Sequence, residues 1–427
     1  MSLVDLTPVF CVDFIDVGDL NSWHVMCYPL AKRYPLAFIL EFSFMRTNLQ
    51  RRTFLTGLTS FAVAGFVLPR LGYGQETGKK EVKTAADQKK LTATVAKGIE
   101  FLKSKQDTDG SLFRQAGIGI TALGMSALMQ NGLTPQDPAV AKGLKVIEES
   151  IQPDGGIYAP KSRFVNYETC LGVMTLSQAN KGGKYDKALK AADKFIKGNQ
   201  FDGPEGFEKD STSFGGGGYG AASGRPDLSN TAFMVEALRA SGTSADDQAI
   251  QNALIFVSRC QNLESPHNTT KFAALENDGG FYYTGAIDDP KDADTTPNGG
   301  LRSYGTMTYA GLKSLLYAGV KGDDPRVKAA VTWIGKNYDL KSNPGMGANG
   351  LYYYYQTFAK ALDVMGENTV KDAKGVEHDW RKELVEELAS RQREDGGWVN
   401  TNKQWLEGDD RLCTCFALLA LSHCRAK

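Results

Sequence analysis

The chain has 427 residues, of which 42% are hydrophobic and 23% charged, a composition typical of a globular protein with one large domain or a few small ones. Its 49 basic and 49 acidic side chains balance. This argues against nucleic acid as a main partner and against membrane binding through a polybasic surface of the protein. The four histidines are not paired at helical or metal-finger spacing, so few ligands are available for a histidine-rich metal site.

An arginine pair, Arg51-Arg52, precedes an uncharged and moderately apolar run that ends before Pro69. This arrangement is typical of a twin-arginine export signal, and the run is too short and too rich in glycine and threonine for a comfortable membrane span. An ordinary N-terminal anchor helix is the alternative. We therefore expect an exported protein, periplasmic or secreted.

This signal divides the chain into three parts. Met45 lies six residues before the arginine pair and is a plausible true start. We expect residues 1–44 to be a gene-model extension, residues 45–75 to be the signal segment, and residues 76–427 to form a single domain.

Six segments of this domain share one pattern: a threonine, once a tyrosine, is followed by a small residue six positions later and by leucine at the seventh. The aligned residues are Thr121, Thr169, Thr231, Thr308, Tyr355 and Thr414. Four copies have glycine eleven positions on, which is the usual C-terminal stop of a helix. The pattern predicts six related helices.

Six further helices are predicted between these segments from apolar residues at i, i+3, i+4 and i+7. Their ranges are 87–105, 138–151, 184–199, 245–260, 324–338 and 379–392. Most are followed by a glutamine and then an Asp-Gly turn, as at Gln106 and Gln392.

The segment Lys97-Gly98-x-x-Phe101-Leu102-x-x-x-Gln106-x-x-x-Gly110 resembles the glutamine/aromatic repeat of squalene cyclases and protein prenyltransferase β-subunits. Gln392 with Gly397-Trp398 resembles the same repeat with its tryptophan intact. The resemblance covers about residues 87–427. It implies an all-α fold, an (α/α)6 toroid of six helix pairs, with the threonine-bearing helices inside and the glutamine-ended helices outside.

In this family the N-termini of the inner helices converge on a central cavity, so the residues before each aligned threonine are candidate site residues. Class II terpenoid cyclases carry Asp-x-Asp-Asp-Thr-Ala there, and the segment that starts at Asp227 is similar but has Ser229 in place of the family's proton donor and Asn230 in place of the last carboxylate. Neither a serine nor a carboxamide is acidic enough to protonate an alkene. The resemblance thus implies a degenerate acid site.

The candidate site residues are taken from the starts of the inner helices and the segments just before them. The candidate catalytic residues are Asp227, Asn230, Glu168 and Asp410, and the candidate ligand-binding residues are Arg225, Tyr304, Arg302, Tyr167 and Arg411. The alternative is that the carboxylates only cap helices and pair with surface arginines. Two long loops, 203–226 and 262–302, lead into inner helices and are candidates for a lid.

Zinc is not expected, because Asp410 and Cys413 offer two ligand types of the prenyltransferase site and no histidine follows at a matching repeat. We expect no metal and no cofactor. The cysteines of the domain have no framework spacing and are interpreted as core residues.

The leading hypothesis is an exported cyclase-like protein that has lost its catalytic acid and binds a small-molecule, lipid or glycan ligand in the central cavity. An active terpenoid cyclase or prenyltransferase with a displaced acid is the enzyme alternative. A glycan-active (α/α)6 enzyme with paired carboxylates and a non-catalytic interaction toroid are the other two.

Overall fold

The computed structural model describes residues 85–425 apart from 222–223 and 288–293, and all of them belong to one compact unit, Leu71–Lys427. The predicted extension and export signal, residues 1–75, lie outside the described residues and stay predictions. Among the described helices, none has the length and apolar character needed to cross a membrane.

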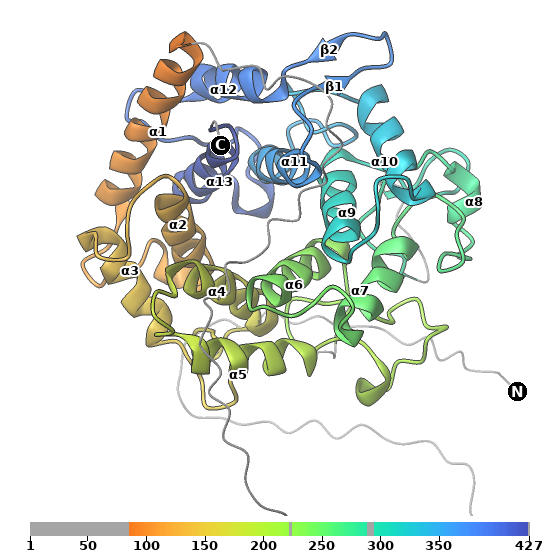
Figure 1. The fold of residues 1–427 in the computed structure, drawn as a ribbon, viewed down its shortest axis with the longest axis horizontal. Coiled ribbons are helices and arrows are strands. Elements are labelled where there is room, and N and C mark those ends of the chain that lie inside the picture. Colours follow the sequence, from red (N-terminus) through yellow and green to blue (C-terminus); the bar gives the residue numbers. More distant parts are fainter. Residues whose placement is uncertain (1–84, 222–223, 288–293, 426–427) are drawn as a thin grey trace, which may run out of the picture. The chain divides into compact units, whose positions relative to one another are not determined.

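Six helices form an inner ring, in which each packs against the next and the last packs against the first (Figure 1). They are α2 (Gly119–Gln130), α4 (Val165–Ala179), α6 (Leu228–Ala240), α9 (Gly305–Tyr317), α11 (Leu351–Met365) and α13 (Asp410–Ser422). Each contains one of the six aligned residues, so the repeat predicted from the sequence corresponds to this ring.

Six helices surround the inner ring. They are α1 (Ala85–Lys105), α3 (Pro138–Glu148), α5 (Asp186–Lys197), α7 (Gln248–Arg259), α10 (Pro325–Lys336) and α12 (Trp380–Arg391). Every predicted outer helix is present, with ends that differ from the prediction by at most three residues. The predicted all-α toroid of helix pairs is confirmed.

The two rings differ in how their side chains are buried. In α5, Leu189, Ala192 and Ile196 form one buried stripe, whereas the lysines of the same helix face outward. In α2, every residue from Gly119 to Leu128 is buried. A helix that is apolar all round must be enclosed by other helices, and one with a single apolar stripe must cover them.

The aligned threonines hold the turn before each inner helix. Thr231 Oγ1 accepts a hydrogen bond from the Gly217 N–H at 3.0 Å and donates to the Asp227 carbonyl at 2.7 Å. The same acceptor role recurs at Thr121, Thr169, Thr308 and Thr414. In the fifth copy the Tyr355 hydroxyl instead donates to the Leu340 carbonyl.

The glutamines join each outer helix to the next. Gln200 Nε2 donates to the Gly215 carbonyl in its own turn and to the Ala249 carbonyl at the start of α7, both at 2.9 Å. Gln106 and Gln261 make the matching pairs of bonds. Gln392 reaches the Thr94 carbonyl in α1, and this bond closes the outer ring.

Short elements absent from the sequence prediction decorate the connections. They are α8 (Ala273–Glu276), an antiparallel pair of strands, β1 (Val370–Lys371) and β2 (Glu377–His378), and the 3-10 turns Arg114–Ala116, Gly203–Glu205 and Gln404–Leu406. The two loops predicted to act as a lid contain the undescribed residues 222–223 and 288–293, so the lid stays a prediction.

Candidate functional site

Asp227 begins α6 and is 2% exposed. One of its carboxylate oxygens accepts the Asn230 N–H at 2.8 Å, and the other accepts the Asn230 Nδ2–H at 2.7 Å. The carboxylate is therefore the N-cap of its helix, as the sequence alternative proposed, and the first of the two bonds satisfies a backbone donor that the helix leaves free.

Aromatic side chains from two connections, the one before α6 and the one before α9, lie near this carboxyl group. Tyr219, Tyr283 and Tyr304 all lie close enough to interact with its charge. Burial raises the pKa of Asp227 to about 6, and hydrogen bonds from Asn230 and Tyr283 only partly offset that rise. Such a group is a weak acid, far from the strength that alkene protonation requires.

Ser229 is the residue that the sequence analysis aligns with the proton donor of class II cyclases. Its hydroxyl is hydrogen-bonded to the Tyr353 hydroxyl at 2.9 Å. The Tyr353 ring lies parallel to Phe233, with centroids 5.8 Å apart, and packs on Phe416 at 5.4 Å. Tyr167 meets the edge of Phe233 at 5.4 Å. These four rings, Tyr167, Phe233, Tyr353 and Phe416, form what we term the aromatic partition, which lies across the middle of the inner ring.

A cavity of about 510 Å³ lies on the other side of the partition. Its apolar lining includes Leu123, Leu171, Met174, Phe233 and Leu419, and its polar lining includes Ser177, Glu236, Arg239, Gln356 and Lys360. Glu236 follows Asp227 by nine residues in the same helix, a rise of about 13 Å at 1.5 Å per residue. The cavity thus lies toward the C-terminal ends of the inner helices.

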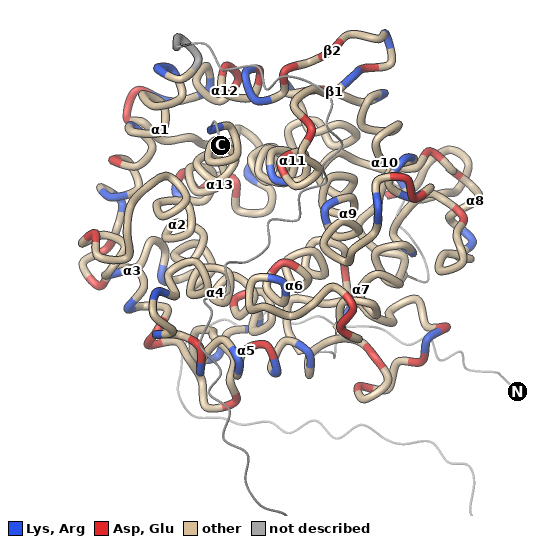
Figure 2. The backbone as a smooth tube through the Cα atoms, in the orientation of Figure 1, with Lys and Arg blue, Asp and Glu red and all other residues tan. Residues whose placement is uncertain are grey.

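A buried ionic cluster forms part of this end of the ring. Lys313 from α9 and Lys360 from α11 each contact a different oxygen of Glu236 on α6. Glu236 and Lys313 are almost fully buried, and Lys360 is 20% exposed. Burial, with the neighbouring Lys360 charge second, lowers the pKa of Lys313 well below that of a solvated lysine. In Figure 2 the inner ring is mostly uncharged, and coloured segments appear on α6, α9 and α11.

The candidate residues Glu168 and Tyr167 lie together on α4. The Glu168 carboxylate accepts hydrogen bonds from the Ala159 N–H at 2.7 Å and the Ser162 hydroxyl at 2.9 Å. It also lies so near Gly117 that a side chain there would collide with it. Burial raises the pKa of Glu168. These bonds join the turn that precedes α4 to α4 itself.

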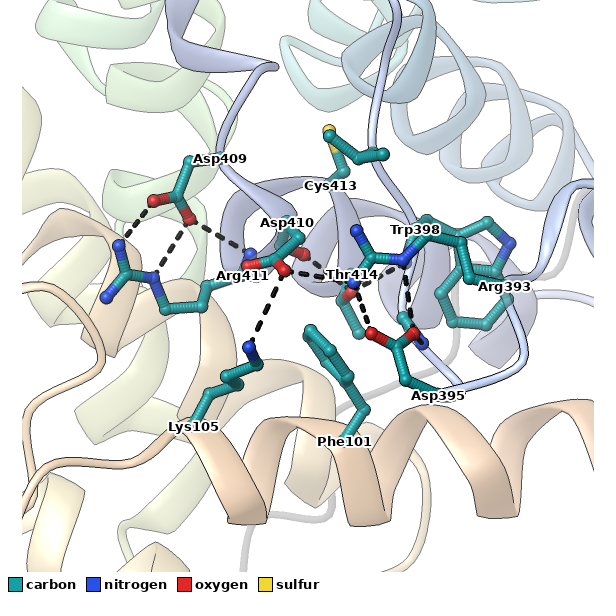
Figure 3. A network of polar contacts seen from close by, with 12 residues as sticks. Phe101, Lys105, Arg393, Asp395, Trp398, Asp409, Asp410, Arg411, Cys413 and Thr414 are labelled. Carbon is teal, nitrogen blue, oxygen red and sulfur yellow. Dashed lines mark hydrogen bonds and ion pairs between the residues drawn. The ribbon is translucent and has the colours of Figure 1, made fainter.

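Asp410 and Arg411 begin α13 and lie apart from Asp227. Asp410 pairs with Arg393 at 3.0 Å and with Lys105 of α1 at 3.7 Å, whereas Arg411 pairs with Asp409 (Figure 3). The Arg411 guanidinium also lies over the Phe113 ring. Figure 3 shows this network between the inner helix α13 and the outer helix α1. Its contacts hold the two rings together.

The remaining candidates lie near Asp227. Arg225 is exposed, and its positive charge offsets a small part of the rise in the pKa of Asp227. Tyr304 begins α9, and burial raises the pKa of its hydroxyl. Arg302 lies near Tyr304, and its buried Nε has no hydrogen-bond partner among the described residues.

The cavity does not lie where the sequence interpretation expected a rim of ligand contacts. None of the nine candidate residues is part of its lining, which comes from the opposite halves of the inner helices. The physical reason is side-chain size, because the rings of the aromatic partition occupy the space between Asp227 and the cavity. Whether the nine residues bind a ligand stays a prediction.

The sequence interpretation missed the cluster of Glu236, Lys313 and Lys360, although a signal for it was present. Each of the three lies five positions after the aligned residue of its copy. The same position in other copies is Ser126, Met174 and Leu419, which line the cavity. Charged residues at a fixed place inside otherwise apolar helices mark the surface that faces the cavity.

The cysteines behave as core residues: among the described residues, all five are buried and none forms a disulfide, namely Cys170, Cys260, Cys413, Cys415 and Cys424. The Cys413 thiol donates to the Glu407 carbonyl at 3.1 Å. Within the described part of the chain, no three side chains of His, Cys, Asp or Glu gather into a group that could hold a metal ion.

We expect Asp227→Asn to change how stability depends on pH. The pKa of Asp227 is raised from 3.8 to about 6, so the folded protein retains a proton that the unfolded chain loses between these values. Stability supplied by this group is therefore present below pH 4 and lost as the pH rises through 6. Relative to the wild type, the asparagine variant should gain about 2–3 kcal/mol between pH 4 and pH 7 in denaturant unfolding.

The exposed Asp323→Asn serves as the matched control and should show no such relative gain. A parallel pH dependence of the wild type and Asp227→Asn would show that the Asp227 carboxyl group does not titrate in this window.

Comparison with known proteins identifies relatives of the chain. The sequence model of the squalene-hopene cyclase C-terminal domain matches residues 163–415. A variant of the type II terpene cyclase MstE from Scytonema, in complex with its substrate geranylgeranyl dihydroxybenzoate, is 13% identical with a TM-score of 0.32, and the alignment covers 80% of this chain and 99% of that chain. Another variant, in complex with the product merosterolic acid A, is 14% identical with a TM-score of 0.31 over 79% and 98% of the two chains. No curated protein matches the chain.

Proposed function

Because the chain belongs to the squalene-hopene cyclase C-terminal domain family, we propose that it binds an apolar, terpenoid-like small molecule in the cavity of its inner ring and does not protonate it. The family and its terpene cyclase-like fold support an apolar ligand. The separation of the acid motif from the cavity supports binding without cyclisation.

That separation is the observation that carries the proposal. Ser229, in the place of the proton donor, is bonded to Tyr353, and Tyr353 packs on Phe233, which lines the cavity. Asp227 lies beyond this partition with both carboxylate oxygens bonded to Asn230. A ligand in the cavity would therefore meet aromatic rings and no acid from this motif.

The size and lining of the cavity support a ligand of moderate length. Its volume falls within the about 300–1,000 Å³ of pockets that enclose small organic molecules. Leucine, methionine and phenylalanine side chains are part of the lining on α2, α4 and α6. Burial of a hydrocarbon chain there would contribute about 0.8 kcal/mol per methylene group.

A binding assay with the full chain tests the proposal. We expect geranylgeraniol to raise the melting temperature, since a ligand at about 100 times its Kd adds about 2.7 kcal/mol to the stability of the folded state. Met174→Trp should abolish the shift, because Met174 lines the cavity and an indole would fill it. Val331→Trp, on the exposed face of α10, is the matched control and should leave the shift intact.

Product analysis after prolonged incubation tests the second part of the proposal, that the protein does not protonate its ligand. We expect unchanged geranylgeraniol and unchanged squalene. A cyclised product that disappears in Asp227→Asn would establish an active cyclase instead. Absence of any ligand-dependent shift in the wild type would leave the non-catalytic interaction toroid as the better description.

The displaced-acid and glycan alternatives gain less support. Asp294, which lies in the segment Asp292-Ala293-Asp294-Thr295 and could supply a displaced acid, is exposed in a loop. The three carboxylates of the glycan alternative contact different groups. Glu168 on α4 accepts the Ala159 N–H, Asp227 accepts the Asn230 N–H of α6, and Asp410 on α13 pairs with Lys105 of α1. A glycosidase requires two carboxylates that face one substrate from opposite sides.

A further inference from the structure

The cavity carries an excess of basic over acidic groups. Glu236 is the one acidic side chain in its lining, whereas Arg239 and Lys360 are both part of it. Lys313 lies behind Glu236 and contacts the same carboxylate. Arg239 also interacts with the charge of Asp246, which lies outside the lining. Within the lining itself, two basic side chains are present for one carboxylate.

The bonds of Glu236 leave donors free. The carboxylate presents one oxygen to each lysine, and its own exposed fraction is only 3%. The Lys360 ammonium has three N–H donors, of which the contact with Glu236 uses one. Because Lys360 is 20% exposed and lines the cavity, its other donors are accessible to a ligand there.

Two further atoms of the lining that can donate a hydrogen bond lack partners among the described residues. They are Ser177 Oγ and Arg239 Nε. Unsatisfied buried polar groups are rare and costly, and two around one cavity indicate a polar ligand group that completes them.

One effect opposes negative charge at this place. The inner helices all end on this side, and helix C-termini carry partial negative charge. That influence falls off within the last turn. Lys360 lies five residues before the end of its helix, so a ligand beside it meets a full positive charge at close range. The full charge decides the sign.

We infer that the ligand is an amphipathic anion, with a carboxylate or phosphate head held by Lys360 and Arg239 and an apolar tail against Leu123, Leu171 and Phe233. This inference rests on the proposed function, since it names the chemical class of the ligand in the same cavity. Arg239 supplies a planar guanidinium and Lys360 a mobile point charge, a combination that suits an oxyanion.

Three ligands with one tail and different heads test the inference on the full chain: geranylgeranoic acid, geranylgeranyl phosphate and geranylgeraniol. We expect one of the two anions to bind at least tenfold more tightly than the alcohol in calorimetric titration. Comparison of the affinities for the two anions identifies the head group as carboxylate or phosphate. Lys360→Met should reduce the affinity for that anion about tenfold and leave the affinity for the alcohol unchanged.

Lys328→Met, an exposed lysine of α10, is the matched control and should change none of the affinities. Equal affinities for the alcohol and both anions would overturn the anionic head and leave the apolar cavity standing. If none of the three binds, the proposed function fails and the inference fails with it. Retention of tight anion binding by a folded Lys360→Met protein would also overturn the assignment.

Discussion

Gly215→Ala is expected to lower the free energy of unfolding by about 3–5 kcal/mol, as measured by denaturant titration. Gly215 has φ +84°, a conformation that costs a residue with a side chain about 1–3 kcal/mol. A methyl group would also overlap the Asn252 carbonyl in α7, and overpacking against a rigid backbone adds about 1–3 kcal/mol. The outer helix would have to move away from the turn.

Gly203→Ala in the same loop is the matched control, because no atom lies within 4 Å of the added carbon and its φ is not positive. We expect it to change the unfolding free energy by less than about 1 kcal/mol. Comparable effects of the two substitutions would mean that the turn does not pack on α7 as described.

The same contact explains the Asp-Gly turns in the other copies. Gly110, Gly155, Gly279 and Gly396 all have positive φ, and each lies against a carbonyl of the next outer helix. At Gly110 and Gly396 an added carbon would lie 2.6 Å from that carbonyl oxygen. The repeated glycine thus reflects a close approach between neighbouring repeats in addition to a local turn.

Glu236→Gln is the second substitution with a large expected effect. It leaves Lys313, which is 2% exposed, without a partner charge, and removal of one member of a buried ion pair costs about 3–5 kcal/mol. We expect that loss in the free energy of unfolding at pH 7. Glu100→Gln, which removes an exposed pair with Lys103, should cost less than about 1 kcal/mol.

Two further measurements separate this explanation from a general packing defect. The double variant Glu236→Gln with Lys313→Met should recover much of the stability, because no unpaired buried charge remains. The deficit of the single variant should also shrink as the pH rises. Loss of the Glu236 charge should lower the folded-state pKa of Lys313 further than burial already does. The folded variant then binds fewer protons than the folded wild type, so its stability rises more steeply with pH below the unfolded pKa of 10.5. If neither the added Lys313→Met substitution nor a higher pH reduces the loss of stability, the role assigned to the ion pair is contradicted.

Much of the fold could be predicted because each repeat carries its own local and neighbouring contacts. Thr231 and its equivalents mark the inner helices, since the hydroxyl bonds the backbone of the preceding turn. Gln392 marks the closure of the ring, since its amide reaches both its own turn and α1. The β1–β2 hairpin and α8 could not be predicted, because they occur once and have no equivalent in other copies.

The candidate site was predictable only in part. Asp227 and Asn230 form the bonded pair that a capping motif at a helix start implies. Asp410 could not be placed from its position in the repeat, because its partners Lys105 and Arg393 lie far from it in sequence. A carboxylate at the start of an inner helix can face the ring or the outer helices, and long-range partners decide which.

The sequence by itself determined the number of helix pairs and their order. The period of the apolar residues and the repeated threonine and glutamine require no knowledge of distant contacts. Only the tertiary structure decided where in the ring the described cavity lies. Tyr353 of α11 and Phe233 of α6 meet across the ring, and Glu236, Lys313 and Lys360 come from three helices to form a charged cluster. Side chains from different repeats share that space, so its shape and charge depend on how the whole ring closes.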